Sequence, residues 1–149
     1  ENIKNLRLNI PDLPKALANY VPFKIVDKTL YISGQAPVQN GELIYKGKVG
    51  SDISINDGIE AAKLCVINII AAVKTGIDGD WDKLDSFVKL TGYVNCLDNF
   101  TDQPKIINGA SDMLVEIFGD QGRHSRVAVG SNSLPLGISV EIDAIVQLK

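Results

Sequence analysis

Apolar and polar residues alternate along the early part of the chain, as they do in strands that have one face on a core. Two such strands are predicted at Phe23–Val26 and Leu30–Ser33, joined at Asp27-Lys28. A third extended piece, Leu43–Lys48, follows the turn at Asn40-Gly41. The fold is therefore expected to begin with three β-elements.

After Ser54 the apolar spacing changes to the period of a helix. Ser54 and Asp57 form an S-x-x-D capping signal, because the serine oxygen can accept a hydrogen bond from the amide three residues on. One apolar face then continues towards Gly76, which is placed to end the helix. That face consists of Ile55, Ile59, Ala62, Val66, Ile69 and Val73.

A strand and a second helix are predicted next. Apolar and polar residues alternate from Val88 to Cys96, and Gly92 within this strand marks a bulge or a close backbone contact. The second helix should begin near Pro104, which fits a first-turn position, and should end before Gly119. Its buried stripe is Ile107, Ala110, Leu114 and Ile117.

The last two predicted strands flank a loop that contains Leu134-Pro135-Leu136. Arg126 stands where the first of them begins. In the second, the alternation from Val140 to Val146 places Glu141 and Asp143 on the face opposite the apolar residues.

The predicted order is β-β-β-α-β-α-β-β, which makes residues 1–149 one domain of the α+β class with a six-strand sheet. Two long helices cannot cover both faces of such a sheet, so both are expected on one face. The other face is left to a partner. We therefore expect oligomerisation through the sheet, with sites formed between subunits.

Composition narrows the class of function. The 149 residues carry a net charge of −3, with a sequence pI near 5.1. This net charge gives no electrostatic attraction to polyanions, so nucleic acid is disfavoured as a partner. The first residues lack the basic start and apolar core of a secretory signal. The apolar run Cys65–Val73 is broken by Asn68 and is too short to span a bilayer. A soluble, cytoplasmic protein without a membrane partner is expected.

Cys65 and Cys96 both lie within apolar patterns. Without a secretion signal they are expected to be reduced core residues rather than a disulfide. One histidine and two distant cysteines give no cluster with metal-site spacing, so no metal is expected.

Four groups of residues together form a more specific pattern. They are Tyr20, the SGQAP of Ser33–Pro37, Asn108 at the start of NGASDM, and R-V-A-V…L-P…V-E-I-D over 126–143. With this spacing the chain resembles the reactive intermediate deaminase family, RidA or YjgF, over nearly its whole length. It is most similar to a longer subgroup that carries GKVG and NGASD.

The resemblance implies a chorismate-mutase-like homotrimer with three clefts between subunits. It implies that Arg126 binds the carboxylate of an enamine or imine such as 2-aminoacrylate. Water then replaces the nitrogen, which gives a 2-oxo acid and ammonia. No metal or organic cofactor is implied, and the partner is a small carboxylate-bearing metabolite.

The residues themselves can support this chemistry. The guanidinium of Arg126 can hold a planar carboxylate with two hydrogen bonds, which fixes the neighbouring imine carbon. Glu141 can orient water and move a proton. Arg126 and Glu141 are expected on strands that place both side chains at the sheet's edge, with Tyr20 lining the same cleft between subunits. Ser33 and Asn108 can place polar hydrogens or accept the leaving ammonia.

Each of these residues also has a purely structural interpretation. Glu141 could form an exposed salt bridge with Arg126 or Lys149 that contributes little to stability. Tyr20 could pack beside a turn, and Asn108 could bond the first helical turn, which is the preferred interpretation for that residue.

The sequence departs from the family pattern around the arginine. The chain reads GRHS directly before Arg126, where the family often has a proline and a small residue. Ala128 stands where many members have cysteine; the resemblance implies that the backbone carbonyl at this position helps to place the amine or water. His124 and Arg123 could make additional contacts with the ligand of Arg126, but the preferred interpretation is that they lie in a solvated loop.

Two alternative functions come from other classes. The family is often labelled an endoribonuclease or translation inhibitor, but the acidic charge and the single histidine disfavour RNA cleavage. A non-catalytic protein that binds or senses small carboxylates would need Arg126 just as the enzyme does.

Overall fold

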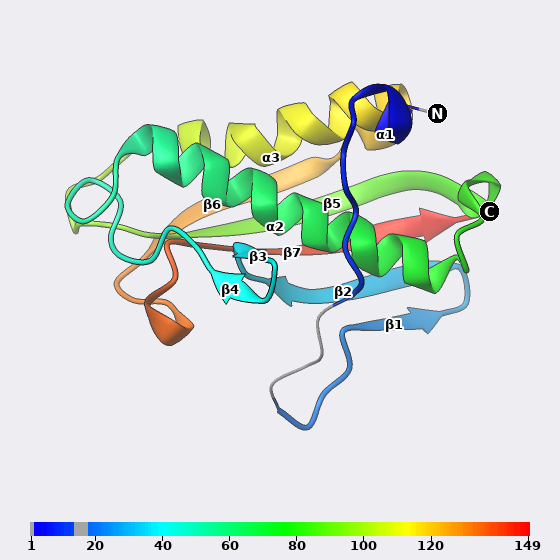
Figure 1. Ribbon diagram of the computed structural model, residues 1–149, viewed down its shortest axis with the longest axis horizontal. Coiled ribbons are helices and arrows are strands. Elements are labelled where there is room, and N and C mark those ends of the chain that lie inside the picture. Colours follow the sequence, from blue (N-terminus) through cyan, green and yellow to red (C-terminus); the bar gives the residue numbers. More distant parts are fainter. Residues whose placement is uncertain (1, 14–17) are drawn as a thin grey trace.

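The computed structural model describes residues 2–13 and 18–149 (Figure 1). The helices are α1 (Asn2–Asn5), α2 (Ile55–Gly76) and α3 (Gln103–Phe118), with short 3-10 turns at Trp81–Lys83, Gly119–Gly122 and Pro135–Gly137. The strands are β1 (Phe23–Val26), β2 (Thr29–Gln35), β3 (Val38–Gln39), β4 (Glu42–Leu43), β5 (Leu84–Asn95), β6 (Ser125–Ser131) and β7 (Val140–Leu148).

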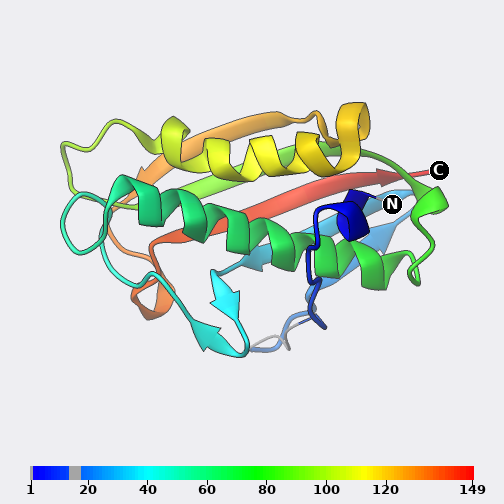
Figure 2. The ribbon, with the colours of Figure 1, turned by 45° about the horizontal axis from the view of Figure 1, so that its top comes forward.

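One five-stranded sheet has the order β1-β2-β7-β5-β6. Its pairs are antiparallel except β5 with β6, which are parallel because α3 forms the crossover between them. The long helices α2 and α3 lie side by side over one face, as Figure 2 shows. The α+β class and the placement of both helices on one face are therefore confirmed.

The expected count of six strands is wrong, since the third extended piece does not join the main sheet. β3 and β4 pair with each other in a separate two-stranded hairpin. The backbone beyond them has positive φ at Tyr45 (55°) and Gly47 (117°), which a strand cannot continue through. Lys46 keeps one isolated bridge, to Ile138.

Both helices begin and end where the sequence predicts. The Ser54 hydroxyl caps α2 by accepting a hydrogen bond from the Asp57 amide at 3.1 Å. Pro104 lies in the first turn of α3, and Gly119, with φ 62°, follows its last residue. The local signals at Ser54, Pro104 and Gly119 therefore agree with the helix boundaries of the structure.

The core lies between the helices and the sheet. Every second residue of β7, from Val140 to Val146, is buried against the helices, as the alternation predicts. Gly92 on β5 lies directly beneath α3, where a Cβ would stand 2.6 Å from Ile107 Cδ1. Of the two alternatives for Gly92, the close contact is the correct one.

Both cysteines are free and buried, which confirms that part of the expectation. Burial, followed by repulsion from Glu141, raises the pKa of the Cys65 thiol well above its ordinary value, so this thiol stays protonated. Within the part of the chain that the structure describes, no helix is long and apolar enough to cross a membrane.

The sheet face away from the helices is left uncovered in the protomer and carries apolar side chains. Tyr31 of β2 and Val127 and Val129 of β6 are exposed by 47%, 42% and 39%. Their neighbours in the pairing register include Ile145 of β7 and Tyr93 of β5. We call these residues the open face.

Candidate functional site

Arg126 points from edge strand β6 towards α3. Its Nη1 donates hydrogen bonds to Asn108 Oδ1 at 2.8 Å and to Ser111 Oγ at 3.2 Å. Asn108 and Ser111 are three residues apart on α3, a spacing that places both on one face of a helix. One end of the guanidinium is thereby held, and its other N–H groups remain for a ligand.

The interpretation of Asn108 as a cap for the first helical turn is therefore wrong. Its side-chain oxygen accepts a hydrogen bond from Arg126, 18 residues later in the chain, and not from the local backbone. The fold brings α3 against the start of β6, which no local pattern around Asn108 indicates.

His124 belongs to the same network, which corrects its interpretation as part of a solvated loop. Its Nδ1 lies 2.7 Å from the Gly122 carbonyl oxygen, which can only accept, so Nδ1 carries the proton. The Nε2 atom then accepts from the Ser111 hydroxyl at 2.8 Å. This turns the lone pairs of the Ser111 oxygen towards Arg126 Nη1.

A cavity of about 280 Å3 opens beside this network. Its lining is Ser111, Val115, Arg123, His124 and Arg126. The exposed Arg123 is paired with Asp120 at 3.2 Å, so Arg126 is the cation whose direction is fixed by uncharged partners. Such a guanidinium can bind a carboxylate without first breaking an ion pair.

Ala128, two residues after Arg126, faces the same side of β6. It is half-buried, packs against the core and lies opposite Gly92 in the parallel ladder. Its small side chain thus fits the narrow space under α3.

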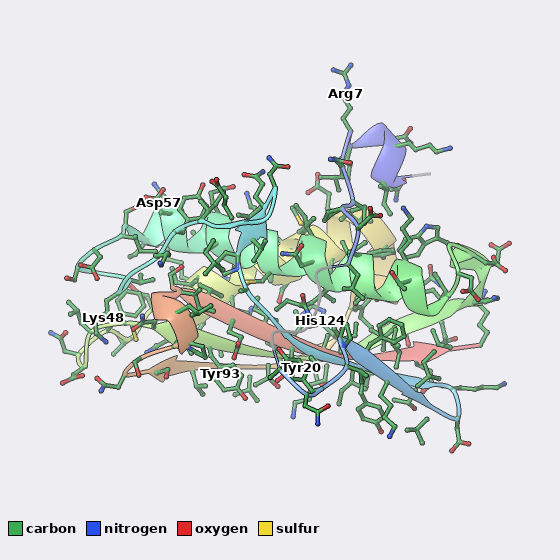
Figure 3. The ribbon with its side chains drawn as sticks, turned by 60° about the horizontal axis from the view of Figure 1, so that its bottom comes forward. Arg7, Tyr20, Lys48, Asp57, Tyr93 and His124 are labelled. Carbon is green, nitrogen blue, oxygen red and sulfur yellow. The ribbon has the colours of Figure 1, made fainter. Side chains whose placement is uncertain are left out.

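Glu141 lies elsewhere in the protomer, which corrects the expectation that it stands at the sheet's edge beside Arg126. β7 is the middle strand of the sheet, and β5 separates it from β6. Glu141 also belongs to the open face, since it lies opposite Tyr93, which points away from the helices in Figure 3. Arg126 and Glu141 therefore occupy opposite faces of one sheet.

Two other predicted residues, Ser33 and Tyr20, lie on β2 and on the loop tied to it, and β2 pairs with the strand that carries Glu141. A Cβ on Gly34 would stand 3.0 Å from Glu141 Cδ, so the backbone of the SGQ motif passes directly over this carboxylate. Ser33 Oγ donates to the Val21 carbonyl at 2.7 Å, and this bond ties the loop that carries Tyr20 to β2. Tyr20 is 52% exposed on this side of the molecule (Figure 3).

The protomer thus carries two separate clusters. The arginine cluster consists of Arg126, Asn108, Ser111 and His124, with Ala128 beside it. The acid cluster consists of Glu141, Ser33 and Tyr20. Sequence reasoning found members of both clusters but missed Ser111, whose only local signal is its helical spacing from Asn108.

The electrostatic setting of Glu141 suits proton transfer. Burial raises the pKa of its carboxyl, and repulsion from Asp143 raises it further. The pKa of Asp143 is also raised by burial, against the lowering effects of a hydrogen bond from Thr91 and the charge of Lys89. Both acids therefore bind protons more tightly than exposed carboxyls do.

This raised pKa gives a testable dependence of stability on pH. A carboxyl that binds its proton more tightly when folded contributes stability at low pH. That contribution is lost as pH rises from about 4.3, the ordinary glutamate value, through the raised pKa. Glu141→Gln cannot ionise at this position, so it does not lose stability as pH rises. The unfolding temperature of Glu141→Gln minus that of the parent should therefore be larger at about pH 7 than at about pH 4.

Thermal unfolding of parent and variant at the two pH values measures this difference. Glu116→Gln, at an exposed position of α3, is the matched control and should show no such trend. An equal difference between Glu141→Gln and the parent at both pH values would contradict the raised pKa.

Among residues 2–13 and 18–149, no three histidine, cysteine or acidic side chains gather as a metal site would require.

Comparison with known proteins gives a family match along nearly the whole chain. The family described as "YjgF/chorismate mutase-like, putative endoribonuclease" matches residues 2–146. Protein TCP17 of Trypanosoma cruzi is 34% identical over 148 residues, which cover 99% of this chain and 92% of TCP17.

Two solved structures are similar throughout. The protein Atu1372 of Agrobacterium tumefaciens, of unknown function, has 42% identity and a TM-score of 0.93, covering 99% of this chain and 91% of its own. A protein called a putative endoribonuclease, from Shewanella oneidensis, has 34% identity and a TM-score of 0.94, covering 99% and 97%.

Proposed function

Because this chain belongs to the YjgF/chorismate mutase-like family, we propose that it hydrolyses reactive 2-imino and enamine acids in the cytoplasm. The products are a 2-oxo acid and ammonia. The reaction needs neither a metal nor an organic cofactor, since an imine carbon is already electrophilic and the protein's main task is positioning.

The observation that carries this proposal is the fixed guanidinium of Arg126. Asn108 and Ser111 accept hydrogen bonds from its Nη1, and a hydrogen bond between Ser111 and His124 orients the Ser111 hydroxyl. The remaining N–H groups adjoin the cavity of about 280 Å3, where they can hold a carboxylate in two parallel hydrogen bonds. The imine carbon next to that carboxylate is then held in one position.

The acid needed for hydrolysis is supplied by a neighbouring subunit in this proposal. Arg126 and Glu141 cannot meet within one sheet, because they lie on opposite faces with β5 between their strands. A homotrimer in which the β6 edge of one copy packs against the open face of the next would bring the arginine cluster of the first copy against the acid cluster of the second. The apolar residues Tyr31, Val127 and Val129 suit such a contact.

In the bound complex, Glu141 accepts a proton from water as the water oxygen adds to the imine carbon. It passes this proton to the nitrogen, which gives a carbinolamine with one hydroxyl and one amino group on the carbon. Glu141 then takes the hydroxyl proton and delivers it to the amino nitrogen, the C–N bond breaks, and ammonia leaves as the carbon becomes the carbonyl of the 2-oxo acid. The raised pKa of Glu141 suits both steps. Tyr20 and Ser33 line the acid side of the cleft, and the Ala128 carbonyl helps to place the amine or water.

Glu141→Gln should leave ligand affinity near that of the parent and slow hydrolysis by about a hundredfold or more, the usual contribution of general acid–base catalysis. The amide keeps the shape of the carboxylate and loses the proton carrier. Turnover is measured as the disappearance of imino acids generated in situ by an amino acid oxidase, and affinity is measured with the 2-oxo acid product.

Glu116→Gln is again the control and should match the parent in both assays. A Glu141→Gln variant with full turnover would remove Glu141 from the reaction. If the parent binds the 2-oxo acid but does not accelerate hydrolysis, the enzymatic proposal is wrong and the protein is a carboxylate sensor.

A further inference from the structure

A further cavity lies on the helix side, between the N-terminal segment and the ends of the two long helices. It has a volume of about 810 Å3, within the usual range for small-molecule sites. The N-terminal segment crosses over α2 here, and Figure 1 shows it passing in front of that helix after α1. The cavity lies between this segment, the ends of α2 and α3, and the 3-10 turn Trp81–Lys83.

One wall of this cavity is aromatic. The Trp81 ring lies 5.6 Å from that of Phe118, measured between centroids, and Phe118 lies 5.0 Å from Phe87 in the core. Trp81 and Phe118 line the cavity and are only partly buried. An apolar ligand that packs against these two rings would bury aromatic surface that is otherwise exposed to water.

The opposite wall belongs to the N-terminal segment, which is held in place. Asn2 Nδ2 donates to the Ile117 carbonyl at 2.7 Å. Ile3, Leu8 and Ile10 pack against the core cluster and also line the cavity. Attached residues of the N-terminal segment thus form part of the cavity wall.

Two cations stand at the rim. Lys4 and Lys74 line the cavity, and neither forms an ion pair with another described residue. One carboxylate, Asp82, also lines it, so the rim keeps one positive charge in excess. An anionic group at the rim would be favoured, and an apolar body would lie against Trp81 and Phe118.

We infer that this cavity, built by Trp81, Phe118, the N-terminal segment and Lys74, binds an organic carboxylate with an aromatic body. The inference stands apart from imine hydrolysis. The cavity shares no lining residue with the one beside Arg126, and it lies on the helix side while Glu141 lies on the open face.

The probe for this site is 4-phenylbutyrate, and the readout is tryptophan fluorescence. Trp81 is the single tryptophan of the sequence, so any change in the emission reports on this cavity. Saturable binding of 4-phenylbutyrate should shift and quench the emission. The uncharged 4-phenylbutanol should bind about fivefold or more weakly, because it lacks the charge that Lys74 and Lys4 attract.

Two variants decide where the probe binds. Lys74→Glu should weaken 4-phenylbutyrate about tenfold while leaving 4-phenylbutanol unchanged, and it should fold, since Lys74 is exposed. Arg126→Ala should leave both affinities unchanged. A flat fluorescence titration confirmed by calorimetry would overturn the inference, as would equal binding by Lys74→Glu or loss of binding in Arg126→Ala. Each of these outcomes is independent of whether the protein hydrolyses imines.

Discussion

Arg126→Ala is expected to weaken binding of a small 2-oxo acid by about 2–5 kcal/mol, which is about thirtyfold or more in affinity. The parent guanidinium is held by Asn108 and Ser111, so it meets the carboxylate already oriented. Removing it leaves that carboxylate without a charged partner in the cavity. Turnover of imino acids should fall with binding, because the same contact positions the reacting carbon.

Two companion variants separate charge from geometry. Arg126→Lys keeps the charge but cannot make two parallel hydrogen bonds, so it should recover only part of the affinity. Arg123→Ala removes a nearby exposed guanidinium that is paired with Asp120, so it should change affinity little. Affinity is measured by calorimetry with a 2-oxo acid. Parent-like binding and turnover by Arg126→Ala would contradict the proposed role of Arg126 in binding the carboxylate.

The second large effect is expected at the open face. Val127→Glu should convert the proposed trimer into monomers of 16.1 kDa and abolish the proposed hydrolysis. Val127 lies on edge strand β6 and is 42% exposed in the protomer. A buried, unpaired carboxylate costs several kcal/mol, and a threefold assembly would contain it three times.

Val127→Thr is the matched control, since it keeps the shape and adds no charge, and it should remain a trimer. Multi-angle light scattering at micromolar concentration measures the mass. A parent protein that is monomeric under these conditions would contradict the proposed assembly. So would a Val127→Glu variant that keeps the mass of the parent.

Local signals in the sequence predicted most of the elements. Ser54 and Asp57 fixed the start of α2, and the alternation along β7 identified its buried face. These predictions succeeded because caps and alternation depend on residues close together in the chain. The error at Leu43–Lys48 arose because apolar composition does not reveal the positive φ values at Tyr45 and Gly47.

The sequence names residues of the candidate site but does not give its geometry. Arg126 and Glu141 were assigned from motif positions, but motifs do not state the order of strands in a sheet. That order places β5 between them. The Ser111–His124 bond joins a helix to the start of a strand, so only the folded chain shows that His124 orients the partner of Arg126.

The proposed mechanism requires that Arg126 of one subunit and Glu141 of another act on the same substrate. Mixing subunits of Arg126→Ala with subunits of Glu141→Gln tests it directly, since each variant alone lacks one half of every cleft. Native mass spectrometry confirms that mixed trimers have formed, and imino acid hydrolysis is then measured. Random mixing should restore complete clefts at about a quarter of the positions, and hydrolysis should return to about a quarter of the parent rate. Mixed trimers whose rate stays at that of the unmixed variants would contradict a site shared between subunits.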